Sequence, residues 1–464
     1  MRVLLVRPDP GNDRFGLGPF FRVEPLGLEY VAAALEAAGH QPAIADLRFG
    51  ASLETWVRRT RPALIGISVM HAVEYDAALE AAWRARRAAP GAFLVAGGHA
   101  AAAHPAPLQS EPFDAVVVDD GETIVPALAA ALEQGRTPAG IPGTIVRGPD
   151  GWVAGGPVTE RPDLDAVPQP ARHLLDDRRA RYHCLLFHPV WAVETARGCP
   201  FRCSFCSVWQ LYDRSFRERS VGAVVQDLAA AGPHVFIVDD LFWHHEERSR
   251  EMARALRARG VRKRWMLVQS RCDLVARHPD LLEAWRPVAA EIDIFFGLEA
   301  PTDAGLSGLA KDATTRDTLE AARIARSLGY QVTGNFVVDP DWTEDQFREL
   351  WSFVETHGFH RAGYTVLTPL PGTQLYEQQR AEIEGRAWAH FDMHHALREP
   401  RLGARRFFEL YAETWRRSIL NLGGRKRWTD WVRQVRPSQV PRLTRVLWRT
   451  QRMMRPEAYL REHP

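Results

Sequence analysis

The sequence predicts an α/β protein with two successive parallel β-sheets and a helical C-terminal region. Short apolar runs alternate with amphipathic stretches along most of the 464 residues, a pattern typical of βα units whose sheet is covered by helices on both faces. A proline-studded stretch separates two series of such units, and three cysteines lie near the start of the second. A chain of this length can bury full cores in two or three domains.

The first series of βα units extends to about Gly135. Its strands are expected at short apolar runs bounded by Gly, Pro or Asp, which are residues 2–6, 42–45, 63–69, 93–96 and 115–118. Helices are expected at residues 28–38 and 75–88, and a hairpin at residues 143–153. Sheets of this kind bind ligands beyond the carboxyl ends of their strands. No G-x-G-x-x-G motif follows the first strand, which argues against a dinucleotide.

The second series begins near Trp191, after a linker that contains Pro162, Pro168 and Pro170. Its strands are expected at residues 191–195, 235–238, 265–269, 292–297, 331–338 and 363–367. Its helices are expected at residues 221–230, 246–258, 281–285, 316–328 and 344–357. Six strands joined by helical crossovers predict a closed or partial β/α barrel, whose chemistry would take place at the carboxyl ends of the strands.

Composition and charge narrow the protein class. The formal net charge of +2 argues neither for nor against a nucleic-acid partner. No apolar run reaches the roughly eighteen residues of a membrane span, and the opening MRVLLVRPDP leads into a strand and not into a signal peptide. Five cysteines with clustered spacing do not indicate disulfides, so we expect a reducing, cytoplasmic compartment.

The cysteine run Cys199-Pro-Phe-Arg-Cys203-Ser-Phe-Cys206 is the strongest chemical signal. Thiolates bind iron–sulfur clusters and zinc. Three local cysteines would leave one iron of a [4Fe–4S] cluster open, whereas structural zinc usually needs a fourth Cys or His close by. The other cysteines, Cys184 and Cys272, form no second close pair. A group of buried core cysteines is the plainer alternative, which the spacing disfavours.

Polar residues recur directly after the expected strands. In the second series these are Asp239, Asp240, Ser270, Arg271, Asp273, Glu299 and Thr368. In the first series they are Asp46, Ser68, the Gly97-Gly98-His99 turn and Asp120-Gly121-Glu122. Any one of them could be a helix cap or a turn residue. Their recurrence at strand ends favours ligand sites in both domains.

The C-terminal region is expected to be helical and basic. Between Arg425 and Pro464 there are eleven basic and three acidic residues. Several apolar side chains fall on one face of a helix, namely Val440, Leu443, Val446, Leu447 and Met454. Such a helix can lie on anionic lipid, or it can pack its apolar face on the barrel while its charges are solvated. A nucleic-acid function is disfavoured because no binding module accompanies the charge.

These motifs together resemble the radical S-adenosylmethionine (SAM) superfamily. The resemblance rests on the C-x3-C-x2-C run, on Phe205 before the third cysteine and on Gly297-Leu-Glu299 after the fourth barrel strand. The Glu24-Pro-Leu-Gly27 segment, the Gly97-Gly98-His99 turn and the stretch from Leu367 to Thr373 resemble the cobalamin-binding (class B) branch. Thr195–Gln210, Asp239–His245 and the Arg/Trp-rich tail are most similar to hopanoid C-3 methylases.

The resemblance, which covers roughly residues 1–380, implies a domain order. A Rossmann-like cobalamin-binding domain is expected at residues 1–156 and a linker at residues 157–190. A partial (β/α)6 radical SAM barrel is expected at residues 191–380, and a helical basic region at residues 381–464.

The resemblance also implies roles for individual residues. Cys199, Cys203 and Cys206 would ligate a [4Fe–4S] cluster whose open iron chelates SAM, and Phe205 would lie near the adenine. Asp239 and Asp240 would contact the SAM amino group, in place of the Gly-Gly-Glu element of many members. Ser270, Arg271 and Glu299 would contact the SAM carboxylate and ribose. In the first domain, the corrin or its nucleotide tail would be lined by Ser68, Gly97, Gly98 and Gly121.

One cobalamin motif is missing. In D-x-H-x-x-G the histidine binds cobalt, but here Asp46 is followed by Leu47, Arg48, Phe49 and Gly50. The first domain is therefore expected either to bind cobalamin without a histidine from that motif or to bind none.

By resemblance the chain would be a cobalamin-dependent radical SAM C-methyltransferase that methylates an unactivated carbon, at C-3 of a hopanoid or in a similar polycyclic lipid. The aromatic residues Phe242, Trp243, Phe295 and Phe296 would line its pocket or fill the barrel core. The partners would be a flavodoxin- or ferredoxin-type electron donor and, through the C-terminal helix, the inner membrane face; no nucleic acid is expected. The alternatives are an oxidative cyclase of the porphyrin-pathway type, a natural-product methylase, and a non-catalytic cobalamin- or metal-responsive binding protein.

Overall fold

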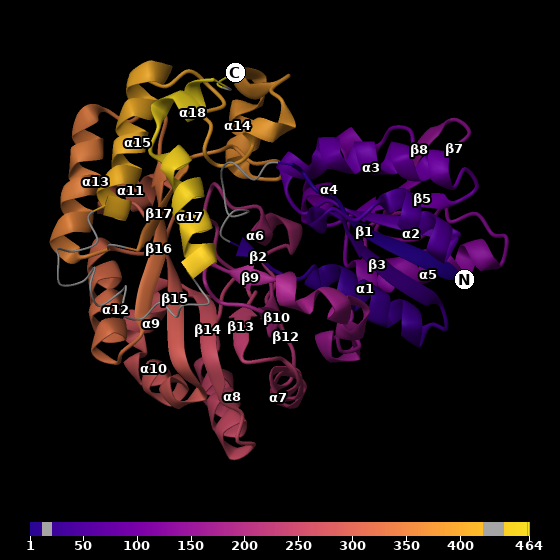
Figure 1. Ribbon diagram of the computed structural model, residues 1–464, viewed down its shortest axis with the longest axis horizontal. Coiled ribbons are helices and arrows are strands. Elements are labelled where there is room, and N and C mark those ends of the chain that lie inside the picture. The colour runs from indigo at the N-terminus through magenta and orange to yellow at the C-terminus, as the bar shows by residue number, and fades with distance from the viewer. Residues whose placement is uncertain (12–20, 360, 421–439, 462, 464) are drawn as a thin grey trace.

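Two sheets, built mainly of parallel strands, lie side by side, and each is covered by helices (Figure 1). The computed structural model describes residues 1–11, 21–359, 361–420, 440–461 and 463. The first sheet and its helices form the indigo to purple half of the molecule in Figure 1, and the second sheet, with the C-terminal helices, forms the other half. Within the described residues, no helix is both long and apolar enough to cross a membrane.

The first sheet has seven strands in the order β3-β1-β4-β5-β6-β7-β8. Five are parallel and match the expected runs: β1 (Arg2–Arg7), β3 (Gln41–Asp46), β4 (Leu64–Ser68), β5 (Phe93–Gly97) and β6 (Ala115–Val117). The expected hairpin, β7 (Thr144–Gly148) and β8 (Gly151–Ala154), adds two antiparallel strands at one edge. Because β1 lies between β3 and β4, the strand order reverses there, which makes the carboxyl ends of β1 and β4 a switch point suited to a ligand.

Helices cover both faces of this sheet, as its fully buried strands require. On one face, α1 (Leu26–Ala37) and α5 (Gly121–Glu133) share a core with β1 and β6. On the other face, α2 (Leu53–Thr60) and α3 (Tyr75–Ala88) share a second core with β4 and β5. The short helix α4 (His99–Ala103) follows β5 directly. The first domain is thus doubly wound, as predicted.

The second sheet has six parallel strands in the order β10-β13-β14-β15-β16-β17. Their bounds are β10 (Trp191–Val193), β13 (His234–Ile237), β14 (Lys263–Ser270), β15 (Ala289–Glu299), β16 (Gln331–Val338) and β17 (Ala362–Val366). Since β10 and β17 are the two ends of this order, the sheet is open. The partial barrel is therefore confirmed and the closed alternative is wrong.

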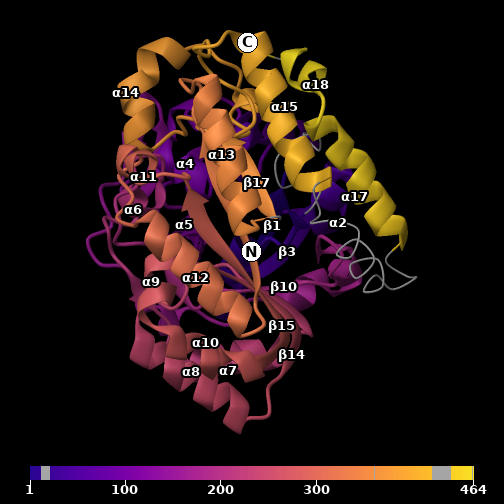
Figure 2. The same ribbon diagram turned by 90° about the vertical axis from the view of Figure 1, so that its left-hand side faces the viewer.

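The outer face of the barrel carries its crossover helices. These are α7 (Val221–Ala230), α8 (Glu246–Ala258), α9 (Cys272–Arg277), α10 (Pro279–Trp285), α11 (Asp303–Gly308), α12 (Thr315–Ser327) and α13 (Glu344–His357); Figure 2 looks onto α12 and α13. Side chains alternate along a strand, so Ile294 and Phe296 of β15 enter the core under these helices, while Phe295 and Gly297 face inward. Phe242 and Trp243 also lie in that core, so of the four expected pocket aromatics only Phe295 faces the interior.

The linker closes part of the inner face. Two short strands, β2 (Phe21–Arg22) and β9 (His183–Cys184), pair antiparallel to each other. Phe187 stacks on Trp265 with ring centroids 4.3 Å apart, and Phe21 packs edge-on against Phe236 at 4.9 Å. The interior is therefore filled near the beginnings of β13 and β14, which leaves the carboxyl ends of the strands for a site.

The chain after the barrel contacts both domains, which the sequence did not reveal. Residues 374–397 include α14 (Gln374–Ile383) and bury Tyr376 and Ile383 in the same core as α3. Trp388 packs on Tyr75 at 4.6 Å between ring centroids. The following helices α15 (Ala404–Leu420) and α18 (Pro456–Leu460) contribute to the barrel core. The C-terminal region therefore holds the first domain against the barrel.

The expected amphipathic helix is present as α17 (Val440–Met453), but its inner face differs from the prediction. Thr450 and Met453 are buried, whereas Val440 is 49% and Trp448 58% exposed. The side chains of Arg442, Arg445, Leu447 and Arg449, together with residues 421–439, lie outside the described part of the chain. Val440 thus belongs to the outward face, in line with Trp448 eight residues later and Arg452 four residues after that.

Candidate active site

The three cysteines lie on one loop at the carboxyl end of the second sheet. The loop is bracketed by a small antiparallel pair, β11 (Ala196–Arg197) and β12 (Arg217–Glu218), and contains the short helix α6 (Val208–Leu211). Gly198 starts the loop with φ 93°, and a Cβ atom there would lie 2.2 Å from the Ser215 carbonyl oxygen. Only glycine fits this turn, which places Cys199 six residues beyond the first barrel strand, β10.

All three thiols are partly enclosed. Burial raises the pKa of Cys199, Cys203 and Cys206, the last to about 12. The charge of Cys203 raises the pKa of both other thiols, as expected for three side chains on one short loop. In the described chain no three His, Cys, Asp or Glu side chains are close enough to hold one metal ion. A [4Fe–4S] cluster instead places each thiolate on a different iron, so this donor set fits a cluster.

The loop is tied to segments that follow two other barrel strands. Ser204 donates its backbone N–H to Leu309 O at 3.1 Å and accepts from Leu375 N at 3.3 Å. Within the loop, the indole N–H of Trp209 donates to Cys203 O at 3.0 Å. The position of Cys203 therefore depends on the loop after α11 and on the start of α14, both distant in sequence.

The two consecutive aspartates after β13 have different surroundings. Asp239 is buried and accepts from Thr195 N at 2.6 Å and from the Thr195 hydroxyl; burial raises its pKa to about 7. Asp240 is exposed to solvent and accepts from Gly198 N at 3.2 Å, yet desolvation raises its pKa to about 6. Asp239 thus fixes the start of the cysteine loop, and Asp240 is the one available to a ligand. Their contacts with SAM stay predictions.

Residues after β14 reach the cysteine loop from another side. The Arg271 guanidinium lies over the Phe201 ring, 3.6 Å from its centroid, and donates to Asp273 Oδ1 at 2.8 Å. Ser270 is buried and donates to Phe242 O at 3.3 Å. The expected role of Arg271 at the SAM carboxylate suits a cation held this close to the cysteines. Phe205 is partly exposed on the same loop.

Glu299 ends β15 and has a partner that sequence reasoning missed. Lys311 Nζ donates to Glu299 Oε1 at 2.8 Å, and both side chains are buried. Burial lowers the pKa of Lys311, but the Glu299 charge and hydrogen bond outweigh this and leave that pKa raised. Lysine is rare in this chain, at positions 263, 311 and 426 only. This rarity is the feature of the sequence that could have drawn attention to Lys311.

In the first domain, the expected cobalamin residues cluster at the switch-point edge. Ser68 ends β4 and is buried, and Gly97 ends β5. Gly98 has φ 118°, and a Cβ atom there would lie 2.7 Å from Val69 O. At Gly121, the start of α5, a Cβ atom would lie 3.2 Å from the Val31 side chain of α1. Packing within the domain therefore explains Gly98 and Gly121, and their cobalamin contacts stay predictions.

The position of the missing cobalt-binding histidine is held by Arg48. Its guanidinium donates to the buried Asp46 at 2.6 Å and 2.9 Å, and Tyr182 also donates to Asp46 at 3.2 Å. This aspartate is thus engaged by Arg48 of its own domain and by Tyr182 of the linker.

Direct contacts join the first domain to the cysteine loop. His99 Nε2 and Ser207 Oγ are 2.7 Å apart, and Arg197, two residues before Cys199, donates to Asp120 Oδ1 at 3.1 Å and to Glu122. Asp240, which follows β13, and His71, which follows β4, are both exposed at the carboxyl ends of their sheets. The two domains therefore meet where both sheets present these ends.

Comparison with known proteins agrees with this arrangement. The family model of the B12 binding domain matches residues 19–129, and that of the radical SAM superfamily matches residues 193–354. The hopanoid C-3 methylase of Methylococcus capsulatus is 31% identical over 419 residues, which are 88% of this chain and 78% of that protein. The anaerobic magnesium-protoporphyrin IX monomethyl ester cyclase of Rubrivivax gelatinosus is 26% identical over 83% of this chain and 71% of its own length.

Solved structures share the fold. The cobalamin-dependent SAM radical enzyme OxsB, with aqua-cobalamin and SAM bound, has a TM-score of 0.73 at 16% identity and covers 97% of this chain and 71% of its own. The radical SAM methyltransferase TsrM of Kitasatospora setae has a TM-score of 0.65 at 20% identity over 83% and 76%. The chain belongs to the cobalamin-dependent radical SAM methyltransferases, which use a [4Fe–4S] cluster, cobalamin and SAM.

Proposed function

We propose that this protein methylates an unactivated carbon of a hopanoid or a similar polycyclic lipid, with C-3 of the hopanoid as the first candidate. The observation that carries the proposal is the 31% identity to a hopanoid C-3 methylase over 88% of the chain. The cofactors supply the radical that activates the carbon and the methyl group that replaces its hydrogen. The protein's task is to hold them and the substrate in register and to keep water out.

The residues at the carboxyl ends of the two sheets can perform this task. Cys199, Cys203 and Cys206 would hold the cluster, and the accessible carboxylate of Asp240 would receive an ammonium group of SAM. Arg271, fixed over Phe201, would face the SAM carboxylate, since a guanidinium suits planar carboxylate recognition. Phe295 offers an apolar surface to the substrate. Ser68 and Gly97 would lie against the cobalamin in the first domain.

Product analysis tests the proposal. A hopanoid-producing host that carries the gene should contain a hopanoid heavier by one methylene unit, absent from a host without it. The Cys203→Ala variant is the matched control, because loss of one cluster ligand should abolish the product while the first domain stays folded. Hopanoids of unchanged mass in a host with cluster-loaded protein would contradict the substrate assignment.

A second candidate is an oxidative cyclase, favoured by the 26% identity to the magnesium-protoporphyrin cyclase over 83% of the chain. The two reactions differ in their products. A methylase forms S-adenosylhomocysteine together with 5'-deoxyadenosine, whereas a cyclase of that type adds no methyl group to its substrate. Purified protein that forms 5'-deoxyadenosine alone during turnover would favour the cyclase.

Two partners complete the proposal. Reduction of the cluster requires an electron donor, which we propose to be of the flavodoxin or ferredoxin type. A membrane-embedded substrate also calls for contact with lipid, and α17 offers Trp448 and Val440 on its outward face, where an aromatic ring is a common interfacial anchor.

Vesicle binding tests the membrane contact. Replacement of Trp448 and Val440 by alanine should weaken sedimentation with anionic phospholipid vesicles several-fold. Trp83→Ala is the matched control, because Trp83 is also exposed, by 43%, but lies on α3 of the first domain. Equal sedimentation of all three proteins would contradict a role for α17.

A further inference from the structure

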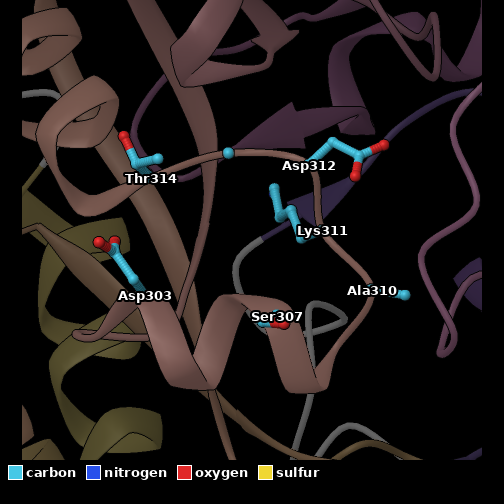
Figure 3. A pocket seen from close by; sticks show the side chains of 7 residues that line it. Asp303, Ser307, Ala310, Lys311, Asp312 and Thr314 are labelled. Atoms are coloured by element: carbon cyan, nitrogen blue, oxygen red, sulfur yellow. The ribbon is translucent and has the colours of Figure 1, made fainter.

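Lys311 forms a buried ion pair and a hydrogen bond with residues at the end of β15. It lies on the loop between α11 and α12, where its side chain and that of Asp312 leave the loop in different directions (Figure 3). The loop lines a polar depression of about 330 Å³. The Lys311 ammonium group donates to Glu299 Oε1 at 2.8 Å and to Gly297 O at 2.7 Å. Its charge is thus held by two fixed oxygen atoms.

The strand is shaped to receive this lysine. Its pairing with β16 shifts register between Gly297 and Glu299, and Glu299 has φ 57°, a left-handed conformation that costs a non-glycine residue about 1 kcal/mol or more. A Cβ atom at Gly297 would lie 2.4 Å from Lys311 Nζ and 2.5 Å from Glu299 Oε1. The glycine and the strained glutamate both leave room for the ammonium group, which indicates a specific role for it.

The same loop packs on the cysteine loop on either side of Lys311. Leu309 O accepts the backbone N–H of Ser204, the residue after Cys203, at 3.1 Å. Asp312 O accepts from the Arg271 guanidinium, which itself lies over Phe201 of the cysteine loop. Lys311 is therefore held between two attachments to the segment that contains Cys203.

Two cationic side chains lie beside the cysteine loop. Lys311 is held between the attachments that Leu309 and Asp312 make to this region, and Arg271 lies over Phe201 of the loop. Glu299 contacts the ammonium group of Lys311 from the end of β15. The loop between α11 and α12 therefore brings a buried positive charge to the segment that contains Cys203.

We propose that Lys311 is a positioning residue for the iron–sulfur cluster. Its ammonium group holds Glu299 in place and supplies a positive charge near Cys203, and this charge makes the cluster easier to reduce. Reduction adds one negative charge to the cluster, and a buried cation stabilises that state more than it would in water. Net charge and local environment are established determinants of cluster potential. The inference rests on the cluster at the three cysteines and is independent of the substrate.

The chain offers a matched control. Lys263 is the other lysine of the described chain, and it is also buried, but it begins β14 at the opposite end of the barrel and donates to Ala231 O at 2.6 Å. Removal of either ammonium group leaves a buried acceptor unpaired. Only Lys311 should act on the cluster.

A redox titration of reconstituted protein, followed by electron paramagnetic resonance, tests the inference. In Lys311→Met the equilibrium constant for cluster reduction should fall about tenfold, a shift of the midpoint potential by about 59 mV to more negative values. Lys263→Met should leave the potential at the wild-type value. An unchanged potential in Lys311→Met, or an equal shift in both variants, would overturn the proposal.

A second variant predicts the opposite sign. Glu299→Gln removes the negative partner and leaves the ammonium charge less neutralised, so the midpoint potential should become less negative than in the wild type. A purely structural role for the pair would not move the potential in opposite directions in the two variants. If Lys311→Met fails to take up a cluster, the midpoint potential of Glu299→Gln tests the inference by itself. An unchanged or more negative potential in Glu299→Gln overturns the inference.

Discussion

His99 Nε2 lies 2.7 Å from Ser207 Oγ, which joins the turn after β5 to the residue that follows Cys206. Burial, with a smaller contribution from nearby His71, lowers the pKa of His99 to about 4. The imidazole is therefore neutral at and above neutral pH, and the bond is one between uncharged groups. It is a direct contact between the cobalamin-binding domain and the cluster loop.

His99→Ala and Ser207→Ala should each reduce stability by about 1 kcal/mol, the net value of one such hydrogen bond. Amide hydrogen exchange across residues 196–216 should accelerate in both variants, because the loop loses a tie to the first domain. The double variant should be as stable as the less stable of the two single variants, because both side chains contribute to one interaction. Additive losses would show that the two side chains act separately.

A buried ion-pair network should contribute more to the domain contact. Glu24, before α1, is fully buried. It accepts from Arg172 at 2.6 Å and from Ala192 N of β10 at 2.7 Å, and it forms an ion pair with Arg179. Glu24→Gln leaves these arginines short of a counter-charge, a change that typically costs about 3–5 kcal/mol. We expect a clearly lower midpoint of denaturant unfolding.

Glu54→Gln is the control for this variant. Glu54 pairs with Arg84 at 2.8 Å, but both side chains are about one-third exposed, and such surface pairs contribute about 1 kcal/mol or less. Tryptophan fluorescence during urea titration would report both variants. Similar midpoints for the two would contradict the assignment of Glu24 as a principal tie between the domains.

The strands could be predicted from the sequence because each is buried on both faces and therefore consists mainly of apolar residues. Residues 331–338, 221–230 and 344–357 form the strand and helices expected there. Periodicity records which face is buried but not the partner that buries it. For that reason Phe242 and Trp243 were not separable from pocket residues, and the packing of residues 374–397 on the first domain was not foreseen.

The site was predictable to a similar degree. Cysteine spacing located the cluster loop, because thiolates in a short run have few structural explanations. Contacts such as Arg197 with Glu122, or Lys311 with Glu299, depend on which loops the fold brings together. Nothing in the local sequence of either residue specifies its partner, so these positions required the structure.

Two adjacent glycines separate packing from cofactor binding. Gly98→Ala should cost roughly 1–3 kcal/mol, because its φ of 118° and the 2.7 Å approach to Val69 O leave no room for a side chain. At Gly97 a Cβ atom would lie 3.4 Å from Val117 Cβ, an ordinary contact, so Gly97→Ala should change stability by less than about 1 kcal/mol.

If Gly97 lies against the corrin, Gly97→Ala should retain less cobalamin after reconstitution despite a normal thermal unfolding midpoint. Absorbance of the bound cobalamin measures the first quantity and calorimetry the second. Full cobalamin content in Gly97→Ala would remove this residue from the predicted contacts.

The pH dependence of SAM binding should report Asp240. Desolvation raises the pKa of this carboxyl group to about 6, and only its ionised form can pair with the SAM ammonium group. The ionised fraction falls about tenfold from pH 7 to pH 5 for such a group, so the affinity for SAM should fall by about the same factor as the pH is lowered. Calorimetric titration of cluster-loaded protein measures this.

Asp240→Asn should bind SAM more weakly at pH 7 and lose most of the decline toward pH 5, since no charge remains to be neutralised. Asp239→Asn is the contrasting change, because Asp239 is fully engaged with Thr195. It should lower stability while the pH profile of SAM binding persists in the protein that remains folded. If SAM binding by Asp240→Asn keeps the pH dependence of the wild type, another group contacts the SAM ammonium.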